Sequence, residues 1–195
     1  MHKKFAKIHK ILVDLDGVLC NLDSSILKSY RQIYPDYRFI PLDQRVGQCS
    51  DLDYLQRFSR KEANAVQRIL KTPGFFRTLE PNADAVEAVK RLNVRRRDLK
   101  VYLCTTPWYR NSTCVQDKMD WVEDNLGKRW IRKMIITPDK SLIKGDILFD
   151  DKPKVSGEFE HVMVRCQHNS HVDAKWVLED WKDVEQIIDT VLHTS

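Results

Sequence analysis

The chain has 195 residues, 42% of them hydrophobic and 31% charged, which is enough for one packed domain with a small insert. Its net charge of +5 suits an anionic ligand but is too small to require a nucleic acid partner. The five cysteines are an odd number without a CxxC pair, which argues against a disulfide framework and favours the reducing cytoplasm.

The first ten residues, MHKKFAKIHK, are basic and lead only into a short strand-like run. They show neither the apolar stretch of a signal peptide nor that of a membrane span, so we expect no membrane partner and a cytoplasmic location. The same opening is also compatible with a truncated targeting segment.

The first predicted strand covers residues 8–15, and two acids, Asp14 and Asp16, stand at its end before Gly17. Carboxylates are costly to bury, so two of them in and after an apolar run call for a role. Ligands of open parallel sheets bind beyond the carboxyl ends of the strands. The placement therefore predicts that both acids face a ligand.

Residues 21–76 interrupt the alternation of strands and helices. Helical patterns cover residues 24–33, 51–58 and 61–70. They are joined by the extended segment YPDYRFIPLDQRVGQ, and no strand of core quality occurs among them. We interpret this stretch as a small helical insert after the first strand, over the sheet edge. The expected division is an insert over 21–76 and a core made of 1–20 and 77–195.

The remaining chain alternates strand and helix patterns. Apolar runs rich in Val and Ile cover residues 100–105, 134–137, 146–149 and 161–166. Amphipathic patterns cover residues 82–92, 117–126 and 183–192. Asn82 and Gly127 have the positions of a helix start and a helix end. The order predicts an α/β fold with a Rossmann-like parallel sheet.

The most basic run, at residues 95–97, stands just before a predicted strand. We interpret it as a solvated turn rather than a nucleic-acid patch. No stable complex with nucleic acid is therefore expected.

Polar side chains follow four of the predicted strands, and parallel strands bring their carboxyl ends to one edge. These residues are Asp14 and Asp16, Thr105 and Thr106, Thr137 and Lys140, and Asp150 and Asp151. Four close carboxylates repel one another unless a cation neutralises them, and their hard oxygens suit Mg²⁺. A lysine and hydroxyl groups can hold phosphate oxygens. The set predicts a site for phosphoryl transfer.

The two acids of the first strand can have different tasks. One carboxylate can attack phosphorus and form an aspartyl-phosphate. The other can protonate the leaving oxygen and later activate water. A turn at Gly17 permits both side chains to face the same ligand.

These motifs resemble those of the haloacid dehalogenase superfamily of phosphatases, with DLDGV as the first, LCTTP as the second, Lys140 as the third and DD as the fourth. The stretches PLDQR, PGFF, LEP, WVEDNLG, GDILFDDKP and CQHNSH narrow the resemblance to the 5′(3′)-deoxyribonucleotidases, over nearly the whole chain. The resemblance implies a phosphomonoesterase with a helical cap. It would hydrolyse deoxyribonucleoside monophosphates with Mg²⁺ through an aspartyl-phosphate.

The resemblance also assigns roles to the four acids. Asp14 is implied to be the nucleophile and a metal ligand, and Asp16 the general acid and base, with its backbone carbonyl on the metal. Asp150 is implied to be the third protein ligand, and Asp151 to act on the metal through water or a ligand.

The same comparison of motifs gives candidate substrate residues. Thr105, Thr106 and Lys140 would bind the phosphate, with Thr106 in a position where serine is more usual. Arg45 and Phe75 are further candidates for contact with the substrate. The implied partner is a nucleoside monophosphate. Family members of this size are often dimers, although no interface signature is legible in the sequence.

The insert departs from the family pattern. Leu22, Gln48 and Leu70 stand, by local alignment, where the family places aromatic residues around the base. Stacking on an aromatic ring contributes ~1–3 kcal/mol per base, so the family's base preference is not implied for this chain. Phe75, Phe76 or Trp108 could supply an aromatic ring for stacking on the base instead.

Three alternatives stay open at this stage. The site could serve another phosphomonoester, such as a polynucleotide end or a sugar phosphate. A catalytically silent binding module would keep only the fold, but the presence of all four acids and Lys140 argues against it. His168 and His171 have the HxxH spacing of a zinc pair, although no Cys or acid motif completes a zinc site.

Overall fold

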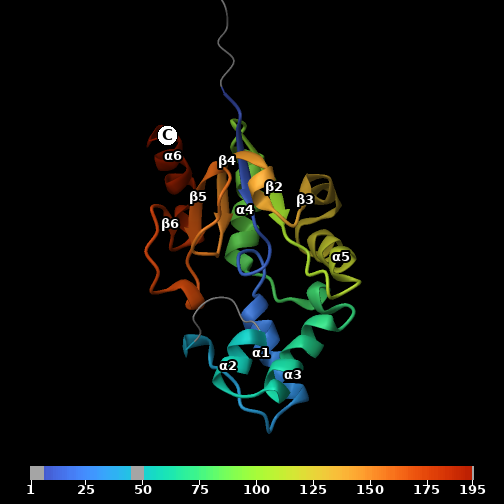
Figure 1. Ribbon diagram of the computed structural model, residues 1–195. Helices are drawn as coiled ribbons and strands as arrows, with labels where there is room; N and C mark the ends of the chain where they lie inside the picture. Colours follow the sequence, from blue (N-terminus) through green and yellow to red (C-terminus); the bar gives the residue numbers. More distant parts are fainter. Residues whose placement is uncertain (1–6, 45–50, 195) are drawn as a thin grey trace, which may run out of the picture.

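The strand-like runs of the sequence form one sheet of six parallel strands in the computed structural model, which describes residues 7–44 and 51–194 (Figure 1). The order across the sheet is β3–β2–β1–β4–β5–β6. The strands are β1 (His9–Val13), β2 (Leu99–Thr105), β3 (Met134–Ile136), β4 (Lys144–Asp150), β5 (Glu158–Val164) and β6 (Val177–Leu178). The sequence predicts the first five of these strands. It does not predict β6, because two residues are too few to show a pattern.

The topology places β1 at the centre of the sheet. Ile11 of β1 pairs with Val101 of β2 on one side and with Ile147 of β4 on the other. The chain runs outward from β1 to β2 and β3 and then returns to β4, so its direction across the sheet reverses between β1 and β4. Such a reversal opens a crevice at the carboxyl ends of the strands, where ligands of this architecture bind.

All six predicted helices are present, with shifts only at their ends. They are α1 (Leu22–Ile33), α2 (Asp51–Arg57), α3 (Arg60–Lys71), α4 (Ala83–Arg95), α5 (Cys114–Leu126) and α6 (Val184–Thr194). The side chain of Asn82 accepts a hydrogen bond from the Ala85 amide at the start of α4, and Gly127 ends α5 with a φ of 100°. Both terminal signals in the sequence are therefore confirmed.

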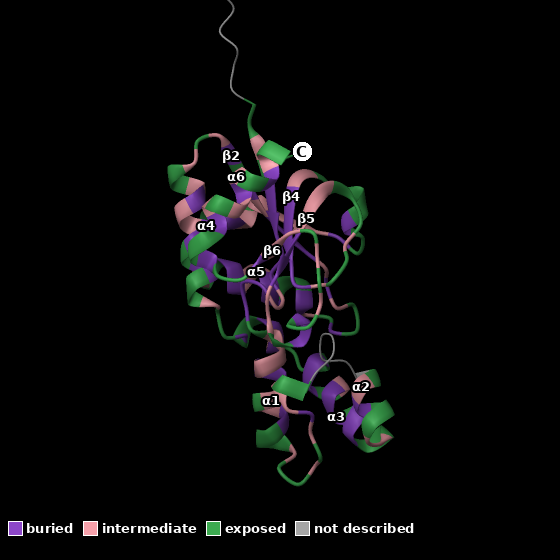
Figure 2. Ribbon diagram, turned by 90° about the vertical axis from the view of Figure 1, so that its left-hand side faces the viewer, coloured by how far each residue is buried: buried purple, intermediate pink, exposed green. Residues whose placement is uncertain are grey.

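The two faces of the sheet are covered differently. Alternate residues of β1, Ile11 and Val13, belong to the large core that includes apolar residues of α4, α5 and α6. Figure 2 shows α4 and α6 together on this side of the sheet. Leu12 faces the other way, into a small cluster with Cys104 and Leu148. The residues of β1 that face both sides of the sheet are buried, so the position of this central strand is fixed by packing. The direction of the side chains that follow the strand is fixed with it.

Helices α1, α2 and α3 lie beyond the carboxyl ends of the strands and form a helical lobe (Figure 1). Tyr30 of α1 is fully buried there, and its ring centroid lies 5.2 Å from that of Tyr54 in α2. The three helices predicted after the first strand are thus present, while their role as a cap stays a prediction. The status of the insert as a separate domain over 21–76 stays a prediction. No helix among the described residues is long and apolar enough to span a membrane.

The basic run 95–97 covers the end of α4 and the link to β2, where a turn is predicted, but Arg96 is not simply solvated. Arg96 is half-buried, and one guanidinium nitrogen lies 2.8 Å from carboxylate oxygens of both Asp98 and Asp189. Arg96 therefore ties the end of α4 to α6.

Candidate active site

Asp14 is held at the centre of the crevice. It directly follows β1, and its backbone amide donates to the Phe149 carbonyl oxygen of β4 at 2.9 Å. Its carboxylate Oδ1 accepts a hydrogen bond from the Leu15 amide at 2.8 Å, and Oδ2 lies 2.9 Å from Nζ of Lys140. The side chain is buried, so backbone and lysine together fix the direction of the carboxylate.

Lys140 joins two of the acids. It begins the short helix η4 (Lys140–Leu142), and its Nζ also donates to Asp150 Oδ2 at 2.6 Å. Burial alone lowers the pKa of Lys140, but the carboxylates of Asp14 and Asp150 outweigh burial and raise it above the usual lysine value. Lys140 therefore stays charged in the interior, where it compensates two carboxylates.

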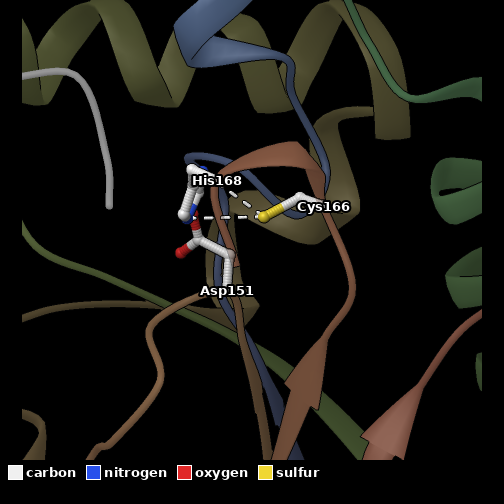
Figure 3. Close-up of side chains that lie close together, drawn as sticks. All are labelled: Asp151, Cys166 and His168. Carbon is white, nitrogen blue, oxygen red and sulfur yellow. Dashed lines mark hydrogen bonds and ion pairs between the residues drawn. The ribbon is translucent and has the colours of Figure 1, made fainter. Parts of the chain in front are cut away.

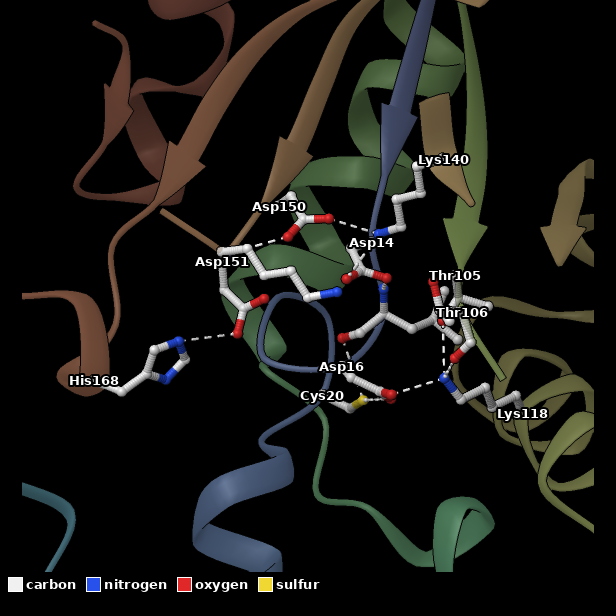
Figure 4. A network of polar contacts seen from close by, with 12 residues as sticks. Asp14, Asp16, Cys20, Thr105, Thr106, Lys118, Lys140, Asp150, Asp151 and His168 are labelled. Atoms are coloured by element: carbon white, nitrogen blue, oxygen red, sulfur yellow. Dashed lines mark hydrogen bonds and ion pairs between the residues drawn. The ribbon is translucent and has the colours of Figure 1, made fainter. Parts of the chain in front are cut away.

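Asp16 faces a second lysine that the sequence analysis missed. Lys118 of α5 donates through Nζ to Asp16 Oδ2 at 2.7 Å, to Thr105 Oγ1 at 2.9 Å and to the Thr106 carbonyl oxygen at 2.7 Å. These three bonds use every proton of the ammonium group. Burial lowers the pKa of Lys118, but Asp16 and Asp14 raise it above the usual value. Figure 4 shows Lys118 and Lys140 on different sides of the carboxylates.

A signal for Lys118 does exist in the sequence. Residues 114, 118, 121 and 122 share one face of a helix, and three of them are Cys114, Trp121 and Val122. Lys118 thus stands in the buried stripe of α5, and only 1% of its surface is exposed. A lysine in such a stripe requires acceptors within reach, which here are the half-buried Asp16 and the buried Thr105.

The fourth strand brings two further acids to Asp14. Asp150 and Asp151 follow one another at the end of β4, and both are fully buried. Carboxylate oxygens of Asp14, Asp150 and Asp151 lie within 4.8 Å of one another. Burial, together with the charge of Asp14, raises the pKa of Asp150. A divalent cation would relieve that repulsion, and the hard oxygen donors fit Mg²⁺.

The expected metal set and the observed cluster differ in one respect. The carboxylate of Asp16 is directed to Lys118, while that of Asp151 lies with Asp14 and Asp150. A role of Asp16 on the metal would therefore fall to its backbone carbonyl, as the resemblance implies. This role stays a prediction.

Gly17 allows Asp151 to approach the first strand. The glycine has a φ of 78°, and a Cβ atom built on it would lie 2.0 Å from Oδ2 of Asp151. A side chain at this position is excluded by both the backbone conformation and the nearby carboxylate. The DLDG motif therefore contains its glycine because the acid of the fourth strand occupies the space.

His168 does not form the zinc pair suggested by its spacing from His171. His171 is exposed, whereas the buried His168 lies against Asp151 and Cys166 (Figure 3). Its Nε2 is 3.2 Å from Asp151 Oδ2 and its Nδ1 is 3.2 Å from Asp23 Oδ2. The Cys166 sulfur is almost equidistant from the two ring nitrogens, at 3.3 and 3.4 Å. We interpret the group as hydrogen-bonded rather than metal-binding, because both ring nitrogens already face carboxylates.

The candidate base-binding residues have different environments. Phe75 is buried against Phe76, with ring centroids 5.3 Å apart, and Leu70 is buried in the core. Trp108 is partly buried against that core. Leu22 is half-buried at the start of α1. Arg45 and Gln48 lie outside the described residues.

A pocket of about 370 Å³ lies next to Gly17, between the first turn of α1 and the segment after β5. Leu22 lines it together with polar residues from both sides. These are Asn21, Asn82, Gln167 and His168. A ligand in this pocket would contact the first turn of α1, Gly17 and the segment after β5.

Comparisons with known proteins agree with this geometry. Residues 7–194 match the family described as 5′ nucleotidase, deoxy (pyrimidine), cytosolic type C. The human cytosolic 5′(3′)-deoxyribonucleotidase is 36% identical over 86% of this chain and 85% of its own length. The mouse mitochondrial 5′(3′)-deoxyribonucleotidase is 32% identical over 90% of this chain and 84% of its own. The HAD-hydrolase YfnB of Bacillus subtilis, solved with magnesium, has a TM-score of 0.58 at 7% identity, covering 94% of this chain and 99% of its own.

Substitution of Gly17 should separate backbone strain from disturbance of Asp151. Gly17→Ala and Gly74→Ala both place a side chain at positive φ, which costs about 1–2 kcal/mol, but nothing lies within 4 Å of a Cβ at Gly74. We expect both variants to lose comparable thermal stability from strain, with a further loss for Gly17→Ala. Only Gly17→Ala should lose most of its phosphatase activity. Equal activities of the two variants would contradict the role given to the Gly17–Asp151 contact.

Removal of the Lys118 charge should slow the reaction without unfolding the chain. Lys118→Met keeps the apolar stem but leaves Asp16 without its cation. We expect kcat to fall about 100-fold, at the lower end of general acid–base effects, with little change in KM. Lys128→Met, at an exposed lysine just beyond α5, is the matched control. A kcat for Lys118→Met within twofold of that of the control would show that Asp16 does not depend on Lys118.

Proposed function

Because the chain belongs to the 5′(3′)-deoxyribonucleotidase family of HAD-like phosphomonoesterases, we propose that it hydrolyses (deoxy)ribonucleoside monophosphates to nucleoside and phosphate. The observation that carries the proposal is the meeting of Asp14, Asp150 and Asp151 with Lys140 at one edge of the sheet. Acids alone would repel a phosphate group. Acids that are arranged for a divalent cation and accompanied by a buried lysine can hold one.

Mg²⁺ is the proposed cofactor. The carboxylates of Asp14 and Asp150 and the backbone carbonyl of Asp16 would hold it, and Asp151 would act through water or directly. Bound there, the ion would neutralise charge on the phosphate as the reaction proceeds. The close carboxylate oxygens and the raised pKa of Asp150 support this assignment.

The first step proposed is attack by a carboxylate oxygen of Asp14 on phosphorus. The bond between phosphorus and the nucleoside oxygen breaks, and Asp16 donates its proton to that leaving oxygen. Asp14 then carries the phosphoryl group as an acyl phosphate. Lys118 would donate a hydrogen bond to the carboxylate of Asp16 that this step generates.

The second step proposed uses the same two residues. The Asp16 carboxylate takes a proton from water as the water oxygen attacks phosphorus. The bond between phosphorus and the Asp14 oxygen breaks, which releases phosphate and restores both residues. Asp14 and Asp16 both follow β1 at the carboxyl end of the sheet, where ligands of parallel sheets bind, and this supports the division.

The phosphate group would be held by Lys140 and the hydroxyls after β2. Thr105 Oγ1 accepts a hydrogen bond from Lys118, so its own proton remains to be donated to a phosphate oxygen. Thr105 is fully buried and Thr106 is half-exposed, as expected for residues at the bottom and the rim of a site.

The helical lobe is proposed to act as a cap over the nucleoside. The pocket beside Gly17 is lined by the first turn of α1 and by His168, which contacts Asp151, and polar groups surround it. A nucleoside there would be shielded from water while its phosphate reaches Asp14. We place Leu22 next to the base for two reasons. Leu22 lines the pocket, and the family resemblance puts it at a position that contacts the base.

A cytoplasmic setting is part of the proposal. One close relative is of the cytosolic type, which supports the expected cytoplasmic location. The substrate proposed is a mononucleotide rather than a polynucleotide. A homodimer stays a prediction.

Replacement of the nucleophile gives a direct test. Asp14→Asn should abolish Mg²⁺-dependent phosphate release from dUMP, because an amide does not form the acyl phosphate. Glu87→Gln, at an exposed acid of α4, should behave as wild type. Chelation by EDTA should stop the wild-type enzyme, and added Mg²⁺ should restore it. Substantial turnover by folded Asp14→Asn would refute the nucleophile assignment, and turnover in EDTA would refute the cofactor.

An aromatic ring at position 22 should strengthen nucleoside binding. Leu22→Phe should lower KM for dUMP and dGMP about fivefold, the equivalent of ~1 kcal/mol of stacking, with kcat unchanged. KM for a sugar phosphate should not change. Leu27→Phe, on another part of α1, is the control. An unchanged KM of Leu22→Phe for every nucleotide would show that the base does not lie next to residue 22. If the wild-type enzyme acted only on oligonucleotide ends or sugar phosphates, the alternative substrate class would be favoured.

A further inference from the structure

His168 connects the acid-bearing edge of the sheet to the helical lobe. It lies in the short helix η5 (Gln167–Asn169), and only 5% of its surface is exposed. One ring nitrogen faces Asp151 Oδ2 and the other faces Asp23 Oδ2, each at 3.2 Å. Asp151 directly follows β4, whereas Asp23 belongs to the first turn of α1. A single side chain therefore contacts two elements that the chain order keeps 128 residues apart.

The two contacts determine the form of the imidazole ring. A neutral ring donates from one nitrogen only, so its other nitrogen would direct a lone pair at a carboxylate. Both contacts are favourable when each nitrogen carries a proton. Each ring nitrogen lies 3.2 Å from a carboxylate oxygen, so the geometry holds the ring between the two acids.

The segment that carries His168 is itself rigid. The neighbouring Asn169 is fully buried, and its side-chain amide donates to the carbonyl oxygens of Asp151 and Val164, both at 2.8 Å. Its side-chain oxygen accepts from the Cys166 amide at 2.9 Å. Arg165 donates to the Asn169 carbonyl oxygen at 2.7 Å. These bonds fix the backbone on both sides of His168, so the ring has a defined position.

The contacts of Asp151 limit where its carboxylate can lie. Oδ2 stands where a Cβ of residue 17 would be, and the same oxygen faces His168. Gly17 has no side chain and so leaves room for this oxygen beside the first strand, while His168 contacts the same oxygen from η5. The oxygens of Asp151 thereby stay within reach of Asp14 and Asp150.

From this geometry we propose that His168 is a positioning residue, which holds Asp151 beside the metal-binding acids and holds the first turn of α1 against the same edge of the sheet. The second contact matters for the substrate because Leu22, next to Asp23, lines the pocket proposed for the nucleoside. Metal binding and lobe position thus depend on one buried side chain. The catalytic consequence rests on the proposed function, but the two structural consequences do not.

The main test compares His168→Gln with His171→Gln. The second variant changes an exposed histidine three residues away and is the matched control. A glutamine amide can donate to one carboxylate at a time from this position, so one contact of His168 is lost. We expect the affinity for Mn²⁺, measured by electron paramagnetic resonance of the free ion, to fall about tenfold in His168→Gln. Amide hydrogen exchange at residues 22–26 should become faster. The control should match wild type in both.

A second variant separates the two contacts. Asp23→Asn removes the charge on the lobe but leaves Asp151 and His168 in place. It should speed exchange at residues 22–26 and raise KM for dUMP more than it lowers kcat, while the Mn²⁺ affinity changes less than threefold. Adding Asp23→Asn to His168→Gln should produce little further change in exchange, because both remove the same contact.

Two outcomes overturn the proposal. One is wild-type Mn²⁺ affinity together with wild-type exchange in His168→Gln. The other, which also decides the matter if His168→Gln does not fold, is wild-type exchange at residues 22–26 in Asp23→Asn. If the wild-type protein releases no phosphate from any nucleotide, the proposed function fails, yet the Mn²⁺ and exchange measurements still decide the role of His168.

Discussion

The structure depends on the pairing of buried carboxylates with buried cations at the carboxyl ends of the strands. An unpaired charge in such a place costs several kcal/mol, so each acid needs a compensating group. Five carboxylates share three cations: Asp14 and Asp150 with Lys140, Asp16 with Lys118, and Asp151 and Asp23 with His168. More acids than basic side chains therefore meet at this edge. A divalent cation would reduce the repulsion among their carboxylates.

The sheet topology explains why the acids meet. Because β1 is central and β4 pairs directly with it, the residues after both strands emerge side by side. The cations come from other directions: Lys140 from the connection after β3, Lys118 from α5 and His168 from the segment after β5. Packing of α5 against the core through Trp121 and Val122 positions Lys118 as firmly as it positions those apolar residues. The geometry of the site at Lys118 therefore depends on the packing of the core.

The residues that follow the strands can be predicted from the sequence, whereas contacts between distant segments cannot. Asp14, Asp16, Asp150 and Lys140 follow strand-like runs, and parallel strands have only one edge at which such residues can meet. Helical periodicity predicts that Lys118 lies on the buried face of α5. It does not predict that Asp16 is its partner, because periodicity identifies the face of a helix and not the residues that pack against that face. The contact between Asp23 and Asp151 through His168 depends on how a loop and a lobe pack. Such tertiary contacts leave no pattern in the local sequence.

The central claim is that a divalent ion and a phosphate group share this edge of the sheet. The most direct measurement is anomalous diffraction from crystals of the full chain grown with Mn²⁺ and inorganic phosphate. The account predicts one strong peak among the carboxylates of Asp14, Asp150 and Asp151, with phosphate oxygens near Lys140 and Thr105. A peak at another place, with these carboxylates bound only to their lysines, would contradict it.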